Sequence, residues 1–521
     1  MDEGAQKEGS SPVLVIALDA SEITLIDRLC AAGEMPNLQA LRRRGARARL
    51  IHKHGGLQAS VWRSFATGQE VTRHGCYFPK MWRPEKMRVD FIDRDWPPSA
   101  PFWSRPGVSQ PRVALIDIPY LVDIGTRHNG VVLNNWQNHD PLPEVEHPKT
   151  IKAQVRNRFG NSALPEQDYG PQSAEILERA YRTCLASTSQ IADICEWLMT
   201  RDRYDLFVLA MGATHRAGHQ LWDLSQIDAA SLDDARRSSL ENALADVYRA
   251  SDHALGRIIA AAPDNARIVV MALHGMGPQT AWNEFFQPVF ELAAGMPARE
   301  SDSNTALGLL KRVKDFPLVK SITVHAPPRL HPGLTRFWTR RMYDWPTTQY
   351  FWVPSDVEGY VRLNLRGREP EGVVERGTEA RALLEELADG FRELRDLDTG
   401  QPIVEHVEFI DDLPTPVSPL RDCIPDLIIH WTDFPQRQSR GLRNRHGHER
   451  HWKKGRRHLS GRSGNHRPDG WAVMISDDMP KGVDLGAVPA INLAPTISTW
   501  LGLGVSDSFD GEPLQRQLEL A

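Results

Sequence analysis

Short apolar runs alternate with amphipathic stretches along most of the chain. Four of these runs are predicted to be buried strands: 13–18, 113–118, 204–210 and 268–273. A parallel strand that is covered on both faces is a short, continuous apolar run. Apolar positions recur at helical spacing over 173–199 and near 240–262, which predicts helices there. This alternation predicts a doubly wound α/β fold, with a mostly parallel sheet and helices on both faces.

Several stretches interrupt the alternation. Residues 1–11 are polar and are expected to form a disordered tail, with a single catalytic domain over 12–521. Proline and tryptophan break the pattern over about 79–175 and about 279–350, which we interpret as cap or insert segments. Residues about 437–462 are rich in arginine, lysine and histidine, which is typical of a solvated loop.

The composition excludes some partners. Of the 521 residues, 41% are hydrophobic and 25% are charged, and the formal net charge is −5. This balance gives no basic field, so neither a nucleic acid polymer nor an anionic membrane is expected as a partner. The apolar run at 13–18 is too short for a signal peptide or a membrane-spanning helix. The five cysteines are widely spread and odd in number, so we expect reduced thiols and a cytoplasmic location.

Polar side chains follow three of the predicted strands. Asp19 follows the first strand, His274 follows the last, and His215 and His219 come just after the strand at 204–210. The four-residue spacing places both imidazoles on one face of a helical turn, as a metal ion needs from two ligands. In open α/β sheets, ligands bind at this edge. Taken alone, Asp19 is also typical of a helix N-cap, and the histidine pair of an ordinary surface or core pair.

Several separated motifs resemble one known family. The early matches are Asp19, Pro36-Asn37-Leu38, Trp62, Ser64, Thr67-Gly68 and His74-Gly75. The later matches, in the same order as in the family, are 214–222, 268–278, 359–372, 425–431, 463–471, 493–503 and 510–514. Over nearly its whole length the chain thus resembles the type I phosphodiesterase/nucleotide pyrophosphatase branch of the alkaline phosphatase superfamily.

The resemblance implies a two-metal site. In that family, two divalent ions, commonly Zn²⁺, flank a threonine or serine whose oxygen attacks phosphorus. Asp19 and His274 match ligands of one metal, and His219 and His466 match ligands of the other. His215 stands where the latter metal usually has an aspartate. Because imidazole is an equally good zinc ligand, the resemblance implies a three-histidine site.

Two other positions depart from the family pattern. Leu273 replaces an aspartate that binds the second metal, and a leucine side chain cannot bind a metal. Gln58 stands at the usual position of the nucleophile, and an amide does not attack phosphorus. Ser60 is therefore the candidate nucleophile, with attack by a metal-bound water as the alternative.

The charges near the predicted site favour one metal over two. Two divalent cations would face Asp19 as their only certain anion, which is poor compensation in a partly dry site. We predict one tightly bound Zn²⁺ at His215, His219 and His466. A second divalent ion at Asp19 and His274 is expected to be weakly bound or absent, or the substrate fills that place. A water on a three-histidine zinc has a pKa near 7.

Arginines beside the motifs are candidates for substrate binding. A guanidinium holds phosphate or sulfate oxygens in a bidentate manner, so Arg73, Arg216 and Arg467 are predicted to bind the substrate. Arg467 follows His466 and is also a catalytic candidate. An ion pair between Arg467 and Asp469 is the alternative.

Three functions are consistent with these observations. The first is a metal-dependent hydrolase or group transferase for a small phosphate, phosphonate or sulfate ester, with a phosphodiesterase or phosphatase type of reaction. The second is a one-metal enzyme with altered water-attack or transfer chemistry. The third is a catalytically degenerate member that binds an anionic ligand or partner. Leu273 and Gln58 favour this third function, whereas the five retained ligand-type side chains argue against it.

Overall fold

The computed structural model describes residues 11–519, with gaps. The gaps are 53–57, 93–99, 106–109, 121–128, 139–144, 166, 229, 231, 296–342 and 414–418. The predicted tail at 1–11 therefore lies almost entirely outside the described residues, as does most of the insert expected at 279–350.

A large mixed sheet organises the first lobe. Its described strands are β20 (Asp484–Pro489), β2 (Ala46–Ile51), β19 (Gly470–Ile475), β9 (Arg267–Ala272), β1 (Val13–Leu18), β8 (Leu206–Met211), β5 (Val113–Ile116), β6 (Gly130–Leu133) and β7 (Glu146–His147), in that spatial order. Among them, β19 is antiparallel to both neighbours, and β7 is antiparallel to β6. The other neighbouring pairs are parallel, so the sheet is mostly parallel, as predicted.

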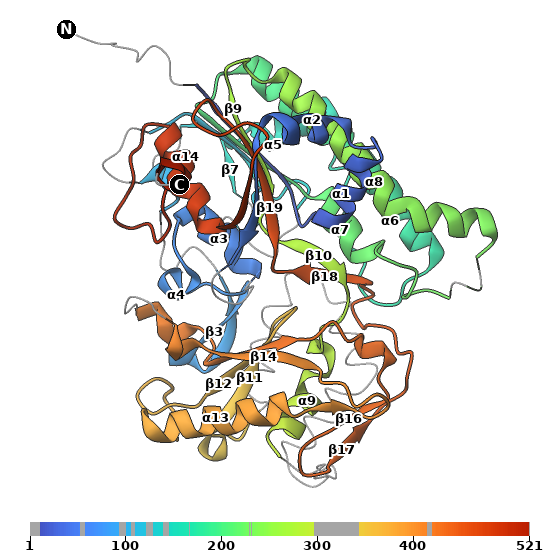
Figure 1. Cartoon of the computed structure of the whole chain (residues 1–521), viewed down its shortest axis with the longest axis vertical. Helices are drawn as coiled ribbons and strands as arrows, with labels where there is room; N and C mark the ends of the chain where they lie inside the picture. Colours follow the sequence, from blue (N-terminus) through green and yellow to red (C-terminus); the bar gives the residue numbers. More distant parts are fainter. Residues whose placement is uncertain are drawn as a thin grey trace.

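Helices cover both faces of this sheet (Figure 1). One face packs against α1 (Ile23–Ala31), α2 (Pro36–Arg44), α5 (Ile151–Phe159), α6 (Ala174–Arg201) and α8 (Asp234–Ala261). The other face packs against α3 (Gln58–Thr67) and α14 (Leu493–Trp500). Alternate residues of β1 enter the two cores, which explains why this strand is apolar at every position. The predicted fold class is confirmed.

A second lobe is built on an antiparallel sheet. Its strands lie in the order β11 (Tyr350–Val353), β12 (Gly359–Leu363), β15 (Leu427–Trp431) and β14 (Val404–Phe409). One face packs against α9 (Phe286–Ala293) and α13 (Thr378–Arg392). The other face packs against the hairpin of β3 (Lys80–Arg83) and β4 (Arg88–Phe91). Figure 1 shows this lobe below the large sheet, with β16 (Gly441–Arg443) and β17 (Glu449–His451) at its end.

The structure revises the expected division of the chain. Within the segment expected as a cap at about 79–175, the sheet strand predicted at 113–118 is present, and residues 113–159 supply three strands and a helix to the first lobe. Conversely, residues 350–451 form the second lobe, although the single-domain prediction did not separate them. The reason is physical: an apolar run such as 427–431 has the same pattern in a parallel or an antiparallel sheet. The periodicity of the sequence predicts the strand, but it does not predict which sheet the strand joins.

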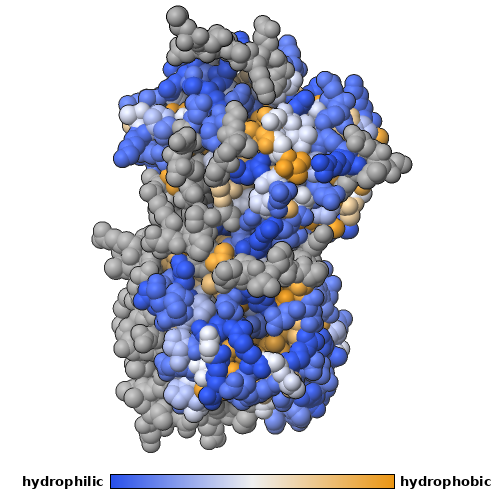
Figure 2. All heavy atoms as spheres, turned by 90° about the vertical axis from the view of Figure 1, so that its left-hand side faces the viewer, coloured by the Kyte–Doolittle hydropathy of each residue, from blue (hydrophilic) through white to orange (hydrophobic). Residues whose placement is uncertain are grey.

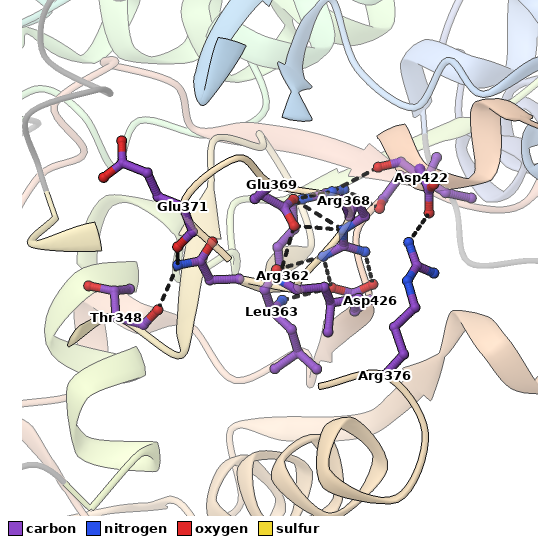
Figure 3. Close-up of polar contacts among 12 residues, drawn as sticks. Thr348, Arg362, Leu363, Arg368, Glu369, Glu371, Arg376, Asp422 and Asp426 are labelled. Carbon is purple, nitrogen blue, oxygen red and sulfur yellow. Dashed lines mark hydrogen bonds and ion pairs between the residues drawn. The ribbon is translucent and has the colours of Figure 1, made fainter. Parts of the chain in front are cut away.

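A buried ion cluster holds the second lobe together (Figure 3). Arg362 pairs with Glu369 at 2.9 Å, and Arg368 pairs with both Glu369 and Asp426, at 2.9 and 2.7 Å. Arg368 also donates to the Leu363 carbonyl. Two cations face two anions at close range, so the cluster neutralises itself.

The surface and the thiols agree with a folded, water-exposed chain. Figure 2 shows that the described residues on one side of the molecule are mostly hydrophilic, with small scattered hydrophobic patches. All five cysteines are free thiols, as predicted. Among the described residues, no helix combines the length and the apolar character that crossing a membrane requires.

Candidate metal centre

Five predicted ligand residues meet at the carboxyl edge of the large sheet. Asp19 follows β1, and His274 follows β9. His215 and His219 lie on α7 (Ala213–Gln220), directly after β8. His466 lies on β18 (Gly464–Arg467), a short strand that pairs with β10 (Gly275–Pro278). Residues separated by up to about 450 positions are thus neighbours in the fold.

Two glycines allow α7 and β18 to approach closely. A β-carbon at Gly464 would lie 2.1 Å from the Gly218 carbonyl oxygen, and one at Gly218 would lie 2.7 Å from the Met276 side chain. A larger residue at Gly464 would push against the backbone of α7, whereas one at Gly218 would displace the flexible Met276 side chain of β10. The close approach places the Gly464 carbonyl 3.0 Å from Nδ1 of His219.

The three histidines 215, 219 and 466 converge through their Nε2 atoms. Nε2 of His215 lies 3.0 Å from Nε2 of His219 and 2.8 Å from Nε2 of His466. Nitrogens that share a tetrahedral zinc ion at its usual bond length lie about 3.3 Å apart. Within the described part of the chain, these three residues form the only group of three or more metal-type ligands.

The protons on these rings show why the cluster suits a cation. Nδ1 of His215 faces the Asp19 carboxylate at 2.8 Å, and Nδ1 of His219 faces the Gly464 carbonyl. Both oxygens only accept, so each Nδ1 carries the proton of its neutral ring. The Nε2 atoms of His215 and His219 then carry no proton, and their lone pairs face each other across 3.0 Å. A bound cation satisfies both lone pairs at once, and no hydrogen bond between the two can.

Burial favours the neutral form of the His219, His274 and His466 rings. It lowers the pKa of His219 and of His466 well below the usual histidine value, and that of His274 to about 4. Neutral imidazole is the form that binds a metal. The ring of His274 lies 4.7 Å from that of His466, centroid to centroid.

Asp19 holds His215 rather than joining the converging nitrogens. One carboxylate oxygen contacts His215, and the other accepts from the Trp62 indole at 3.2 Å. Burial raises the pKa of Asp19, but its contact with His215, with smaller contributions from His274 and Trp62, outweighs this effect and lowers the pKa below the usual value. An ionised carboxylate behind a ligand histidine fixes the tautomer and orientation of the ring. The structure thus places Asp19 against His215, and its role as a ligand of a second metal with His274 stays a prediction.

The predicted nucleophile does not line the pocket beside the histidines. Ser60 is buried near the start of α3, and it does not line the pocket that the histidines open into. The side chain of Gln58 lies outside the described residues. Leu273 is fully buried in the core of the large sheet, and its carbonyl contacts His52 at 2.7 Å. The role of Ser60 stays a prediction.

The three predicted substrate arginines point elsewhere. Arg73 pairs with Asp510 at 2.6 Å, and Arg216 donates to the Pro165 carbonyl at 2.8 Å. Arg467 pairs with Asp433 at 2.9 Å. Because neighbours on a strand face opposite sides, the residue after His466 points away from the cluster. Among the described residues, none of the three arginines lines the pocket.

The alternative partner proposed for Arg467 was wrong. Asp469 lies 3.6 Å from Arg49 on β2 instead. The local sequence around a turn does not show which residue from elsewhere in the chain packs against it. Asp433 and Arg49 both lie outside the turn that contains Arg467 and Asp469.

The histidines open into a pocket between the two lobes. Its lining residues are Asp19, Trp62, Phe78, Pro119, Tyr120, His215, His274, Asp356, Val357, Glu358, Tyr360 and His466. The pocket encloses about 420 Å³, part of which is open to solvent. Asp356, Glu358 and Tyr360 were not foreseen, because the sequence carries no signal that the start of β12 faces the edge of the other sheet.

Fold and site together define an α/β protein with a ligand-type histidine cluster at the carboxyl edge of its sheet. The model of the type I phosphodiesterase/nucleotide pyrophosphatase family matches residues 13–315, more than half of the chain. The chain belongs to this family, so the prediction of the family is confirmed, and with it that of a phosphodiesterase-type ester hydrolase.

Solved structures of low identity also align with the chain. Human ectonucleotide pyrophosphatase/phosphodiesterase 5 is 12% identical, with a TM-score of 0.46, and the alignment covers 96% of this chain and 97% of that one. Phosphonoacetate hydrolase from Sinorhizobium meliloti 1021, in complex with phosphonoformate, is 14% identical, with a TM-score of 0.47 and coverages of 95% and 96%. The comparison with curated proteins found no match.

Proposed function

We propose that the protein is a zinc-dependent hydrolase of small phosphodiesters that uses one tightly bound metal ion. The convergence of three imidazole Nε2 atoms on one point supports the metal, and it is the observation on which the proposal depends. Membership of the family supports the reaction type. A cytoplasmic location is part of the proposal, and the free thiols support it.

His215, His219 and His466 would hold the ion. Zinc bound there supplies a Lewis acid that polarises a phosphoryl oxygen and activates water. Asp19 keeps His215 in the ligand tautomer, and the Gly464 carbonyl does the same for His219. The fold around the site thus holds Nε2 of His215 and Nε2 of His219 without a proton and directed toward the proposed position of the metal.

One ion is favoured over two by the surroundings of Asp19. Both of its oxygens already have partners, and Leu273 is buried in the core where the family pattern has an aspartate. His274 lines the same pocket near the cluster and is the predicted partner of Asp19 for a second ion. A second ion would therefore be held by few groups and bind weakly.

The overall reaction adds water across one ester bond. A water oxygen forms a new bond to phosphorus, the bond from phosphorus to one alcohol oxygen breaks, and the alcohol leaves with a proton. The products are a phosphate monoester and an alcohol. Ser60 is proposed as the first nucleophile, and direct attack by water is the alternative.

Hydrolysis of bis(4-nitrophenyl) phosphate tests the proposal. Chelator-treated protein should be inactive, and stoichiometric Zn²⁺ should restore activity. His219→Ala should reduce kcat/KM by at least about a hundredfold, since it removes one of three ligands. His253→Ala, an exposed histidine on α8, is the matched control and should retain activity. Zinc-independent hydrolysis, or full activity in His219→Ala, would refute the proposal.

The Ser60→Ala variant identifies the nucleophile in an experiment separate from the test of the metal. Loss of activity with zinc still bound supports attack by Ser60. Full activity in this variant assigns the attack to water.

A further inference from the structure

The segment that joins the second lobe to the metal centre concentrates positive charge. Residues 450–468 contain seven lysines or arginines and no aspartate or glutamate. Within this segment, the part that we call the strap, residues 452–463, connects β17 to β18. Four basic side chains of the strap are exposed, namely Lys453, Lys454, Arg456 and Arg457. The strap is thus a basic surface on a chain whose formal net charge is −5.

Little in the surrounding structure neutralises this charge. Lys454 lies 3.5 Å from Asp398, yet its side chain stays 62% accessible. Among the described residues, no acidic side chain forms an ion pair with Lys453, Arg456 or Arg457. In this part of the structure, at least these three cations therefore face solvent or an anion from outside the chain.

Two exposed hydrophobic side chains lie beside the basic residues. Tyr169 and Leu459 are each 56% exposed, the highest value among the large hydrophobic residues that the structure describes. Their two segments touch, because the Gly170 amide donates to the Ser460 carbonyl at 3.3 Å. A β-carbon at Gly461 would lie 2.2 Å from the Gly170 carbonyl oxygen, so the approach is close. One exposed apolar side chain is ordinary, but two on adjoining segments beside a basic run indicate an interaction surface.

The backbone beneath Leu459 is held by hydrogen bonds. The His458 amide donates to the Gln226 side chain at 2.9 Å, and His458 itself is buried. The Leu459 amide donates to the Glu284 carboxylate at 2.8 Å. The Ser460 amide donates to the same carboxylate at 3.1 Å. The fold therefore fixes this part of the strap and directs the Leu459 side chain to solvent.

Basic side chains around exposed apolar ones match an anionic lipid surface. Anionic headgroups attract lysine and arginine, while leucine and aromatic side chains enter the boundary between headgroups and acyl chains. Tyr169 suits such a boundary, because its ring is apolar and its hydroxyl accepts from Arg462 at 3.4 Å. A nucleic acid would use the cations and could stack a base on Tyr169, but it offers nothing to Leu459.

We propose that the strap and Tyr169 dock the protein on the surface of a membrane that contains anionic lipids. This role goes beyond the proposed hydrolase function and does not depend on it. The expectation against a membrane partner rested on the net charge, which averages over the whole surface and does not exclude a local site. Arg462, at the end of the strap, lies 3.9 Å from Asp356 of the pocket, so docking holds the pocket near the lipid surface.

Sedimentation with lipid vesicles tests the proposal. At about 0.1 M KCl, the protein should bind phosphatidylcholine vesicles with about 30% phosphatidylserine at least about tenfold more tightly than pure phosphatidylcholine vesicles. Raising the salt to about 0.5 M should weaken the binding, because it screens the charges. No binding, or equal binding to both kinds of vesicle, would overturn the proposal.

A double charge reversal locates the basic part of the surface. Lys453→Glu/Arg457→Glu should lower the partition coefficient by at least about twentyfold, since each basic side chain contributes about fivefold. Arg43→Glu/Arg44→Glu makes the same change in charge at the exposed end of α2 and should bind as the wild type does. Figure 1 shows α2 and β17 at opposite ends of the molecule. Equal loss in both double variants would show that net charge, and not the strap, determines the binding.

Leu459→Ser tests the apolar part of the surface. It should lower the partition coefficient by about fivefold, because a half-exposed leucine no longer enters the lipid. Val483→Ser, at a residue that is 43% exposed just before β20, is the matched control and should have no effect. Wild-type binding by Leu459→Ser would overturn the docking mode.

Two further measurements separate docking from other kinds of binding. Because these lipids are themselves phosphodiesters, His219→Ala is assayed with the same vesicles and should bind them as the wild type does. Loss of binding in His219→Ala, but not in Lys453→Glu/Arg457→Glu, would place the headgroup in the pocket and overturn the proposal. A fluorescent RNA oligonucleotide is titrated in parallel. Binding of RNA without binding of anionic vesicles would make the strap a nucleic acid surface and would also overturn it.

Discussion

Two buried polar clusters in this molecule have opposite character. In the second lobe, Arg362 and Arg368 face Glu369 and Asp426, and each charged group has a partner of the opposite sign (Figure 3). At the edge of the large sheet, the Nε2 atoms of three histidines face one another. The first cluster is neutralised within the protein, whereas the second presents ring nitrogens of the type that bind a metal cation.

The difference separates a structural role from a functional one. Burial of charge is costly, and a self-neutralising cluster meets that cost with partners from its own lobe. The converging ring nitrogens of the histidines carry no opposite charge among themselves, and such a cluster is a candidate ligand site. Burial alone does not distinguish the structural cluster from the functional one, but the interaction partners of the buried groups do.

The largest effect is expected from breaking the complete cluster. Arg368→Leu leaves Asp426 and part of Glu369 buried without a cation, and the pKa of Asp426, held near 2 mainly by Arg368 against burial, should rise. We expect the free energy of unfolding, measured in urea, to fall by about 3–5 kcal/mol. Zinc bound per folded chain should not change.

Arg366→Leu is the matched control. Arg366 lies two residues away, and its pairing with Glu375 is solvent-exposed, with 60% and 65% of the two side chains accessible. Its loss should cost no more than about 1 kcal/mol. Similar costs for the two variants would show that the buried cluster has no special structural role.

A smaller effect is expected from the carboxylate behind the metal centre. Asp19→Asn removes the anion that orients His215, so zinc affinity should fall by about ten- to a hundredfold, as measured by competition with a chromogenic chelator. Asp484→Asn, on the exposed edge strand β20 of the same sheet, should leave the affinity unchanged. Unchanged affinity in Asp19→Asn would mean that His215 is positioned by other contacts.

The smallest effect concerns Glu358 and depends on pH. The pKa of Glu358 is about 7 in the folded protein, above its usual value of 4.5, so folding takes up a proton there. The wild type therefore loses stability as the pH rises from 4.5 through 7, and Glu358→Gln does not share this loss. The stability of the variant relative to the wild type should rise by about 1 kcal/mol between pH 6 and pH 7.5. A pH-independent difference would contradict the burial of an unpaired carboxylate.

Much of the metal centre could be predicted from local sequence. His215 and His219 are four apart after an apolar run, and the structure places both on α7 beside His466. The strand, the helix and the spacing of the two histidines depend on residues that are close in sequence, so the periodicity of the sequence predicts them. The family resemblance supplied His466, which no local pattern connects with α7.

The position of the second lobe could not be predicted in this way. Glu358 and Tyr360 reach the pocket because a separate antiparallel sheet packs near the edge of the first. The same limit applies to Arg467, whose partner Asp433 is set by the packing of loops. The contacts of Asp19 have the same limit: its spacing shows that it is at the edge, but only the coordinates show that it touches His215 and Trp62.

Metal content per chain tests the central claim most directly. Purified protein, saturated with Zn²⁺ and dialysed, should retain about one equivalent, and His219→Ala should retain close to none while remaining folded. A wild type without bound zinc, or a His219→Ala variant that keeps its full equivalent, would contradict a metal centre built on the three converging histidines.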